Sequence, residues 1–546
     1  MFTRKNILIT IIGILLFSGF VKKDTDIYFE ISKSIDIFGR IYKEVTLNYV
    51  DELDPQEFML AGIEGMLQSL DPYTNFIDGN NQKDMDIIIK GKYGGIGATI
   101  GVRNETITVV DLIEGYSAQR QGIRIGDIIS KIDETIVTKE NYDELNNLLK
   151  GDPGTTVKIT IQREGLEEPI FFNLIREEIE IKNLSYYGFY PENSSNAYLK
   201  LSGFSRTAGE EVKKALIELK GKKNIESIVL DLRGNPGGLL DAAIDVSEKF
   251  LSKGQLVVSV KGRDSAEVKN HFSTEEPVAG IIRLAVLIDE GSASASEIVA
   301  GAIQDHDRGL IVGANSFGKG LVQTLIPLSY NTSLKMTTAR YYTPSGRSIQ
   351  KIDYSDKNKV FELNKKLAKS EFKTDKNRKV FSAGGIQPDS IVNNRSKSHL
   401  VQRLLADGMF FKFATYYYNE KSETDFKKFN SDFLLKEFRE FIKQQKFEFV
   451  SPVEKLIEQL KVAAQQENLN GVFIEMLDKS KAQIDESHSK EMEKYKDDIV
   501  GSIREELAAR SDGRIGRIVE SLINDVQLRT ALSILTNDNV YSKFLK

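Results

Sequence analysis

The chain has 546 residues, enough for three or four domains at a typical size of about 150 residues each. Its 40% hydrophobic and 28% charged residues are ordinary for a soluble globular protein. A net charge of −5 over this length gives no general attraction to nucleic acid, so we expect no nucleic-acid partner. The sequence contains no cysteine, which excludes disulfides, thiolate metal sites and a lipid-modified N-terminal cysteine.

The first 22 residues have the pattern of an export signal. Two positive residues lie within residues 1–5, an almost wholly apolar run covers residues 6–21, and charge returns at Lys22 and Lys23. The run is shorter than the roughly 20 residues that a spanning helix needs, which favours a cleaved signal peptide. Because a clear small-residue cleavage site is missing, an uncleaved membrane anchor stays open as the alternative.

Two regions with different residue patterns follow the signal. Residues 23–84 repeat apolar side chains at helical spacing and contain the turn sequence Leu70-Asp71-Pro72-Tyr73-Thr74, which predicts a small helical domain. Residues 85–181 change to short β-branched runs separated by glycine, aspartate and proline, with one helix over residues 139–150. The expected strands are residues 107–112, 128–132, 157–162 and 170–175.

The second half of the chain predicts an α/β core followed by helices. Residues 182–395 alternate strands with helices, and within them residues 354–380 are highly charged and are interpreted as a surface insertion. Residues 396–546 are charged and helical in pattern. Expected core strands are residues 197–204, 228–232 and 284–288, and expected core helices are residues 208–220, 239–250 and a helix from Ala295.

A glycine-rich loop opens the β-rich module. Its sequence, Tyr93-Gly94-Gly95-Ile96-Gly97, lets successive backbone N–H groups point into one concavity that binds anions such as a peptide's terminal carboxylate. For the glycine run alone, a plain β-turn is the simpler interpretation. The segments that follow, Ser117-Ala118, Gln121-Gly122-Ile123 and Gly126-Asp127-Ile128-Ile129, together with the helix, resemble a PDZ domain.

The PDZ resemblance implies a binding mode for protein C-termini. The partner's last residues would add as a strand beside the loop, and Gly94, Gly95, Ile96 and Gly97 would hold their carboxylate through backbone N–H groups. One departure is the turn before the first short helix, where PDZ domains often have Pro-Ala and this chain has Ser117-Ala118.

A serine at the start of a predicted helix is the candidate nucleophile. Ser294 precedes the apolar run from Ala295, and Glu297 completes an S-x-x-E capping pattern in which the hydroxyl accepts a backbone hydrogen bond. The same helix start offers N–H groups that stabilise an oxyanion. Helix cap and nucleophile are both open from this position alone.

Lys319 is the candidate base. It lies between Gly318 and Gly320 after an apolar strand, a tight setting from which an exposed lysine gains nothing, although a surface turn lysine is the simple alternative. Burial lowers the pKa of a lysine from about 10.4, which lets it activate a serine without histidine. Ser294 and Lys319 are distant in sequence, so the fold decides whether they meet.

Other candidate residues fit the chemistry less well. His306 lies roughly 18 Å along the same predicted helix from Ser294, so it is interpreted as a helix-end residue. Two Ser-x-x-Lys strings, ending at Lys351 and Lys490, lack the companion motifs of penicillin-binding enzymes. The turn Asp231-Leu232-Arg233-Gly234-Asn235-Pro236-Gly237-Gly238 lacks the lysine and hydroxyl of a P-loop, which favours one wall of an oxyanion hole over nucleotide binding.

Five motifs in chain order resemble the C-terminal processing peptidases, also called tail-specific proteases. With the PDZ-like insert, the resemblance runs from about Asp71 to Asp389. It implies a multidomain α/β fold with a crotonase-like ββα core, an inserted, mainly β PDZ domain, and helical N- and C-terminal regions. The motifs are residues 231–238, 291–298, 317–323, 338–350 (TARYYTPSGRSIQ) and 385–389 (GIQPD).

Matched position by position, the resemblance also implies roles in catalysis. Ser294 would be the nucleophile and Lys319 the general base, with Gln323 orienting the lysine. The backbone N–H groups of Ala295 and Gly238 would form the oxyanion hole.

The sequence therefore predicts a serine endopeptidase, exported to the bacterial periplasm or cell envelope, that binds protein C-termini and cleaves nearby without metal or cofactor. Arg176, at the end of the PDZ-like module, is a weaker candidate for coupling that module to the core. The helical ends predict a homo-oligomer, a dimer in the simplest case. The alternatives are a catalytically silent PDZ scaffold, against which the intact Ser, Lys and Gln argue, and an acyl-CoA enzyme, which explains neither PDZ insert nor export signal.

Overall fold

The computed structural model of the protein describes residues 24–79, 87, 91–103, 105–264, 267–354, 365–393, 398–421, 426–467, 469 and 471–545. The expected export signal, residues 1–22, lies outside this description. Of the helices within it, none has both the length and the apolar character that crossing a membrane requires. The chain forms two compact units, a smaller one that contains the N-terminal helices and residues 323–337, and a larger one with most of the remaining residues.

The smaller unit begins with two helices, α2 (Asp24–Asn48) and α3 (Pro55–Gln68), so the predicted helical spacing is confirmed. The predicted turn is also present, because the Asp71 carboxylate accepts the N–H groups two and three residues later, both at 2.9 Å. Strand β1 (Asn75–Ile77) follows and pairs antiparallel with the first residues of β18 (Ser333–Tyr342).

The β-rich module is a sheet with strand order β3-β4-β5-β7-β8, and β6 pairs with β5. Alternate side chains, such as Val157, Ile159 and Ile161, point into one apolar core, as the period of two in a strand requires. All four strands predicted here are confirmed. The strands are β3 (Ala98–Arg103), β4 (Thr106–Leu112), β5 (Ile128–Ile132), β6 (Thr135–Ile136), β7 (Thr156–Gln162) and β8 (Ile170–Ile175), and the helices are α5 (Ser117–Gln121) and α6 (Tyr142–Leu149).

The α/β core is built on a six-stranded sheet with order β10-β11-β12-β15-β16-β23. The first pair is antiparallel and the other neighbours are parallel. Parallel strands bring their carboxyl ends to one edge of a sheet, where binding sites form in α/β folds. The strands are β10 (Leu184–Phe189), β11 (Asn196–Leu201), β12 (Ser227–Asp231), β15 (Arg283–Ile288), β16 (Leu310–Gly313) and β23 (Ser390–Ile391).

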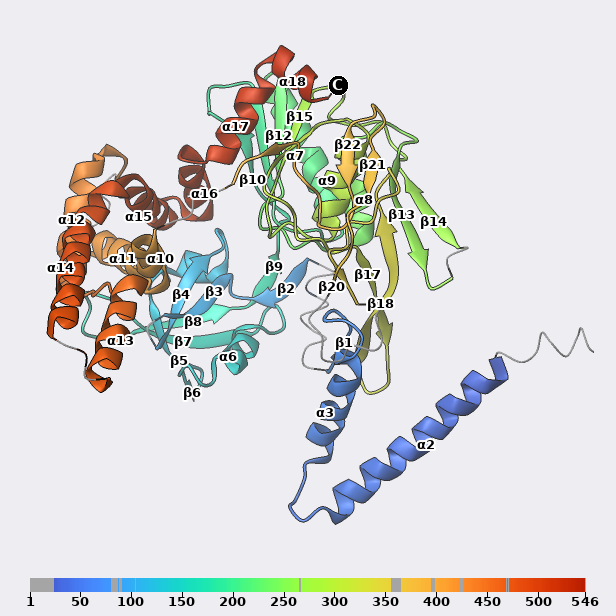
Figure 1. Ribbon diagram of the computed structural model, residues 1–546, viewed down its shortest axis with the longest axis horizontal. Helices are drawn as coiled ribbons and strands as arrows, with labels where there is room; N and C mark the ends of the chain where they lie inside the picture. The colour runs from blue at the N-terminus through green and yellow to red at the C-terminus, as the bar shows by residue number, and fades with distance from the viewer. Residues whose placement is uncertain are drawn as a thin grey trace, which may run out of the picture. The chain divides into compact units, whose positions relative to one another are not determined.

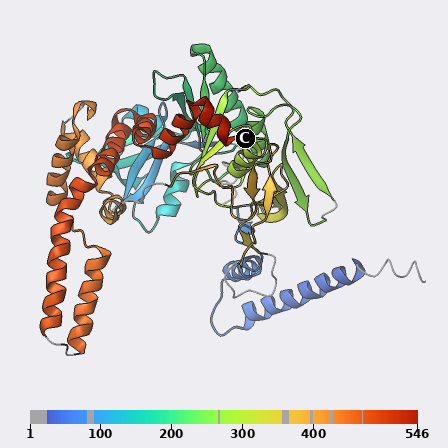
Figure 2. The same ribbon diagram turned by 45° about the horizontal axis from the view of Figure 1, so that its top comes forward.

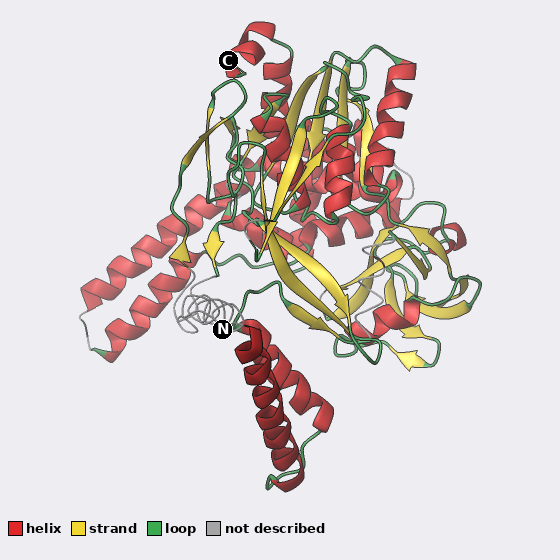
Figure 3. Ribbon diagram, turned by 90° about the vertical axis from the view of Figure 1, so that its right-hand side faces the viewer, coloured by secondary structure: helices red, strands yellow, loops and turns green. Residues whose placement is uncertain are grey.

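Helices cover both faces of this sheet (Figures 1 and 3). Ile228 and Leu230 pack with α7 (Ala208–Lys222), α8 (Leu240–Glu248) and α9 (Ala295–Asp305), as the sequence predicts. The intervening Val229 and the neighbouring Leu287 face the other way, where Leu528, Ala531 and Leu535 of α17 (Val526–Leu535) cover them. Helix α18 (Asp538–Phe544) adds Tyr541, whose hydroxyl accepts the N–H of Leu284 at 3.1 Å.

The predicted C-terminal helical region, residues 396–546, is helical, and its buried apolar side chains divide between two clusters. Its last two helices, α17 and α18, complete the second face of the core sheet together with Leu522, while the helices within residues 399–444 and 496–511 form a separate apolar cluster. A helical pattern predicts an apolar stripe but not the surface that this stripe covers. The earlier helices are α10 (His399–Ala406), α11 (Met409–Lys421), the 3₁₀ turn Phe426–Lys428, α12 (Ser431–Gln444), α13 (Pro452–Gln466), α14 (Gly471–Lys494), α15 (Lys496–Ser511) and α16 (Gly513–Ile523); α13 and α14 run side by side (Figure 2).

Of the predicted surface insertion, residues 354–380, residues 355–364 lie outside the described residues, and the remainder is only partly exposed. Thr374 and Val380 are buried, and the Arg378 guanidinium forms an ion pair with Asp307 just beyond α9. Charged residues in a sequence predict an exposed segment unless they have buried partners. The partner of Arg378, Asp307, is distant in the chain, so the sequence does not reveal it. The remaining strands are β2 (Lys92–Gly95), β9 (Glu177–Glu180), β13 (Leu256–Gly262), β14 (Val268–Phe272), β17 (Leu321–Pro327), β19 (Ile352–Asp353), β20 (Lys365–Lys366), β21 (Glu371–Lys373) and β22 (Lys379–Phe381).

Candidate active site

Three loops meet beyond the carboxyl ends of β12, β15 and β16. The Ala293 N–H donates to the carbonyl oxygen of Asn235 at 3.0 Å, which joins the loop before α9 to the glycine turn after β12. The Phe317 N–H donates to the carbonyl oxygen of Ser292, also at 3.0 Å, which joins the same loop to the one after β16. These three loops carry the predicted nucleophile Ser294, the predicted base Lys319 and the glycine turn that is expected to form one wall of an oxyanion hole.

Ser294 has a strained backbone at the mouth of α9. Its φ of 54° and ψ of −111° are unusual for a residue with a side chain, and such conformations cost about 1–3 kcal/mol each. The glutamate side of the predicted capping box is formed, because Glu297 Oε2 accepts the Ser294 N–H at 2.9 Å. A serine on a strained strand-to-helix turn is also how another hydrolase fold exposes its nucleophile.

Glu297 also contacts the loop that carries Lys319. The Lys319 N–H donates to Glu297 Oε2 at 2.9 Å, so this oxygen accepts hydrogen bonds from the main chains of both Ser294 and Lys319. The hydroxyl of Tyr341 donates to the carbonyl oxygens of the same two residues, at 3.2 Å for Ser294. The fold therefore brings together the backbones of two residues whose meeting the sequence could not establish.

The glycines on either side of Lys319 are required by close packing. A Cβ at Gly318, which has a φ of 89°, would lie 2.7 Å from the Cβ of Lys351. At Gly320, the N–H donates to the Gln350 side-chain oxygen at 2.7 Å, and a Cβ would lie 3.0 Å from the Gln350 nitrogen. Lys319 itself is half-buried.

The glycine turn after β12 lies directly against Ser294. A Cβ at Gly237 would be 2.7 Å from the Ala293 carbonyl oxygen and 2.9 Å from the Ala295 nitrogen, so glycine is needed there. Gly238 is anchored on its other side by a bridge to Phe204. The turn thus brings its backbone to the start of α9, where the first N–H groups of a helix have no partner within that helix.

A network of ion pairs around Arg233 stabilises the same turn. Arg233 Nη2 lies 2.6 Å from Asp231 Oδ2 and 2.6 Å from Asp525 Oδ2, and its Nη1 donates to Gln527 at 2.9 Å. Burial alone would raise the pKa of Asp231, but the Arg233 guanidinium holds it well below its usual range. Asp525 is the N-cap of α17, so a C-terminal helix contributes directly to the stability of the turn.

The other predicted residues have clear positions. His306 ends α9, with Nδ1 2.8 Å from Asp375 and Nε2 2.7 Å from the Leu256 carbonyl oxygen, which confirms it as a helix-end residue. Gln323 lies in β17, and its side-chain amide donates to the Thr337 hydroxyl at 3.3 Å. The hydrogen bonds of the Arg176 guanidinium go to residues 148–156 of its own module, so a role in coupling to the core stays a prediction.

The glycine loop Gly94, Gly95, Ile96, Gly97 leads from one sheet into the next. Gly94 and Gly95 end β2, which pairs with β9, while Gly97 has a φ of 77° and precedes β3. Within the described residues, β3 is at the edge of its sheet and has a strand partner on one side. An edge strand is the surface to which an extended peptide adds.

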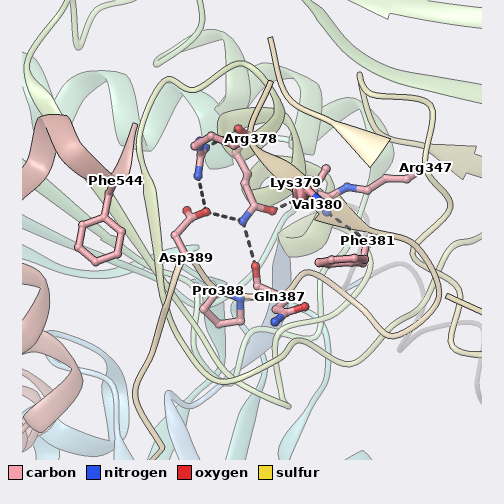
Figure 4. A pocket seen from close by; sticks show the side chains of 10 residues that line it. Arg347, Arg378, Lys379, Val380, Phe381, Gln387, Pro388, Asp389 and Phe544 are labelled. Atoms are coloured by element: carbon pink, nitrogen blue, oxygen red, sulfur yellow. Dashed lines mark hydrogen bonds and ion pairs between the residues drawn. The ribbon is translucent and has the colours of Figure 1, made fainter. Parts of the chain in front are cut away.

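The last two family-like motifs line a cavity of about 240 Å³ at the far end of α9 (Figure 4). Arg347 Nη2 donates to the side chains of Gln304 and Asp305, both at 2.7 Å, and the Gln304 amide donates to the Gln387 carbonyl oxygen at 2.9 Å. These contacts tie motif residues to the end of the helix that begins at Ser294. Residues of these motifs thus support the site from a distance.

Sequence reasoning missed Tyr341 and the extra contacts of Glu297. Glu297 was recognised for its cap, but its bonds to the lysine loop depend on packing between distant segments. Tyr341 lies inside the TARYYTPSGRSIQ motif, which was the one available signal. Within the described ranges, no cluster of histidine and carboxylate side chains is arranged to hold a metal ion.

Comparison with known proteins assigns this chain to a family. Residues 195–356 match Peptidase family S41, residues 94–171 match the PDZ domain, and residues 400–535 match the C-terminal helical domain described for probable PDZ-proteases. A carboxy-terminal-processing protease from Bartonella bacilliformis is 40% identical over 323 residues, which cover 59% of this chain and 73% of that protein. The chain belongs to the carboxy-terminal processing protease family.

A second relative agrees with this assignment. CtpB, a carboxy-terminal processing protease of Bacillus subtilis, is 32% identical over 323 residues, which cover 59% of this chain and 67% of that protein. Among solved structures, a photosystem II D1 C-terminal processing protease is 25% identical and covers 64% of this chain and 85% of that one, with a TM-score of 0.35. The protein is a serine-type peptidase with a PDZ domain, a domain that binds peptide C-termini.

Proposed function

We propose that the chain is an exported carboxy-terminal processing protease in which Ser294 is the nucleophile and Lys319 the general base. The observation that carries this proposal is the shared Glu297 oxygen, which holds the main chains of both residues at 2.9 Å. The strained φ of Ser294 and the glycine turn against it support the same assignment.

The proposed chemistry needs groups of the chain and water. The neutral amine of Lys319 takes the Ser294 hydroxyl proton as Oγ bonds to the scissile carbonyl carbon. Ala295 and Gly238 donate N–H groups to the resulting oxyanion, and one such donor contributes roughly 10²- to 10³-fold in rate. Lys319 then passes its proton to the leaving nitrogen as the C–N bond breaks. Gln323 orients the lysine in this proposal.

Deacylation reverses these proton movements. Water attacks the ester formed on Ser294, and Lys319 takes the proton that water loses. The carboxyl product leaves as Ser294 regains its hydrogen through Lys319. Each turnover therefore consumes one water and returns both side chains to their starting states.

The PDZ domain selects substrates by their C-terminus in this proposal. The carboxylate is held by backbone N–H groups at Gly95 to Gly97, and the substrate's last residues extend the sheet along β3. The edge position of β3 supports this arrangement. Main-chain hydrogen bonds provide affinity with little sequence choice, so small or apolar C-terminal residues are expected to suffice.

Mass spectrometry of a protein with an apolar C-terminal tail tests the function directly. Incubation with the wild-type chain should give a shortened product, and Ser294→Ala should bind the tail without cleaving it. Cleavage that survives both Ser294→Ala and Lys319→Ala would remove the dyad from the proposal. Intact protein bound by the wild type would instead indicate a scaffold.

Export to the bacterial periplasm or cell envelope is supported by the charged start and apolar run of residues 1–21. Cell fractionation checks the compartment, and N-terminal sequencing of the mature protein separates a cleaved signal from an inner-membrane anchor. A full-length chain in the cytoplasmic fraction would contradict export.

A homo-oligomer, expected to be a dimer, is supported by apolar side chains on α2 that are left exposed within the described residues. Ile27, Ile31 and Ile35, which share one face of the helix, are 53%, 50% and 66% exposed. Exposed apolar stripes of this kind usually mark interaction surfaces. Light scattering over a concentration range should give a dimer, and a monomer throughout would refute it.

A further inference from the structure

Glu297 is a fully buried carboxylate that accepts four hydrogen bonds. Oε2 accepts the N–H groups of Ser294 and Lys319, both at 2.9 Å. Oε1 accepts the N–H of Gly318 at 2.8 Å and the hydroxyl of Ser316 at 2.5 Å. Three of these four donors lie on the loop after β16.

A helix cap needs one of these four bonds. The capping box is complete once the glutamate side chain accepts the N–H of the N-cap residue. The bonds to Ser316, Gly318 and Lys319 add nothing to the cap of α9. They attach the loop that carries the lysine to the helix that carries the serine.

We propose that Glu297 is a positioning residue that fixes Ser294 and Lys319 relative to each other for catalysis. This inference rests on the proposed function, because it assigns Glu297 to the same dyad. The carboxylate acts through the two main chains, so it needs no contact with the substrate.

Above the pKa of Glu297, its ionised carboxylate suits this role because all four partners are donors. A carboxylate offers acceptor sites on both oxygens, whereas the amide of glutamine accepts on one side and presents N–H groups on the other. In Glu297→Gln, one side of the pocket would bring an NH₂ group against two donors, which pushes the lysine loop away from the helix. Burial raises the pKa of Glu297 to about 7, although the hydrogen bonds from Ser316, Lys319, Gly318 and Ser294 lower it.

The Ser316 bond extends the support into the GIQPD motif. The Ile386 N–H donates to the Ser316 hydroxyl at 2.6 Å, and that hydroxyl donates to Glu297. The Ile386 N–H thus orients the Ser316 hydroxyl so that its hydrogen points to the Glu297 carboxylate.

The chain contains a matched control at the start of α13. Ser451 and Glu454 form a second capping box, and both residues are buried. Glu454 Oε2 accepts the Ser451 N–H at 2.5 Å, as Glu297 accepts that of Ser294. Glu454 lies outside the catalytic motifs, so Glu454→Gln reports the cost of replacing a buried capping glutamate away from Ser294 and Lys319.

The test measures kcat and KM for a fluorogenic peptide with Glu297→Gln, Glu297→Asp and Glu454→Gln in the full chain. Active sites are counted by labelling with a fluorophosphonate, so that misfolded molecules do not enter kcat. We expect Glu297→Gln to lower kcat by roughly 10- to 100-fold, because displacement by about 1 Å can cost 10²-fold, with KM changed less than 2-fold. Glu454→Gln should keep the wild-type kcat.

Glu297→Asp keeps the charge but is one methylene too short to reach both loops, so kcat should fall about 10-fold. If Glu297→Gln does not fold, Glu297→Asp alone tests the positioning role. Wild-type kcat per active site in either Glu297 variant would overturn the positioning role, as would an equal loss in Glu454→Gln. Activity in Ser294→Ala would instead defeat the dyad, which distinguishes failure of this inference from failure of the proposed function.

Discussion

Two helices of this protein, α9 and α13, begin with the same Ser-x-x-Glu box, but the two boxes have different surroundings. Ser451, before α13, has an ordinary extended backbone with φ −70° and ψ 159°, and its hydroxyl accepts the Glu454 N–H at 3.2 Å. Ser294, before α9, has a φ of 54° and a ψ of −111°. The same local sequence thus forms a relaxed cap at α13 and a strained serine at α9.

The difference lies in what each box touches beyond its own helix. At α9, a glycine turn comes so close that a Cβ on Gly237 would meet Ala293, and Glu297 receives three bonds from another loop. Such contacts over-determine the backbone, which is how strain persists in a folded protein. A capping motif therefore says where a helix begins, while distant segments decide whether its serine has a further role.

The largest expected difference between the two boxes is in catalysis. Ser294→Ala should reduce kcat by roughly 10⁴-fold or more, since loss of a nucleophile removes the covalent route. Ser451→Ala should leave kcat per folded molecule within about 2-fold. A continuous peptide-cleavage assay on both purified variants checks this, and equal activities would erase the distinction.

Replacing the lysine beside the α9 box should have the next largest effect. Lys319→Met keeps the length of the side chain but removes the base, and we expect kcat to fall roughly 10²- to 10⁴-fold. Lys351→Met is the control, because Lys351 is exposed although its backbone N–H donates to the Gly318 carbonyl oxygen at 3.0 Å. The same peptide assay applies, and a similar loss in both variants would point to general disruption of the loop.

A pH effect should distinguish the buried glutamate of the α9 box. The pKa of Glu297 is about 7 in the folded chain against 4.5 in an unperturbed glutamate, so the folded state binds its proton more tightly. Stability gained this way is present at low pH and is lost as pH rises from about 4.5 to about 7. The loss is about 3 kcal/mol for a shift of this size.

Thermal unfolding of the wild type and Glu297→Gln at pH 5 and pH 8 checks this effect. The wild type should be more stable relative to the variant at pH 5 than at pH 8, because glutamine does not titrate. A difference in melting temperature that is the same at both pH values would show that Glu297 keeps one protonation state throughout.

The smallest effect is expected in the stability of the α13 box. Ser451→Ala removes the oxygen that accepts the Glu454 N–H, which typically costs about 1 kcal/mol. Amide hydrogen exchange should become faster in the first turn of α13 while α9 keeps its protection. Unchanged exchange in α13 would mean that its cap contributes little.

Much of the fold could be predicted from local patterns. The strands of the PDZ module and the alternating core elements were found because apolar periodicity is a local property of the chain. The packing of α17 against the core sheet could not be predicted in this way. Val229 and Leu287 need a cover on the second face of the sheet, and no local signal connects them to Leu528.

In the candidate site, too, local motifs could be predicted and contacts between distant segments could not. The Ser294 and Lys319 motifs were visible as short strings, and the resemblance to a family gave them roles. Glu297, which accepts hydrogen bonds from the backbones of both residues, could be predicted only as a helix cap. Its other partners, Ser316 and Gly318, approach it only after the loops fold together. The same reason hid the contact between Tyr341 and both residues.

The ion pairs of Arg233 couple the glycine turn to the order in which the chain is made. Arg233 and Asp231 leave the ribosome together, but Asp525 and Gln527, which complete the network, lie 292 and 294 residues further along the chain than Arg233. A chain cut short before α17 would have one face of its core sheet uncovered and the Arg233 guanidinium half-paired. The turn beside Ser294 can therefore be completed only after α17 has been synthesised.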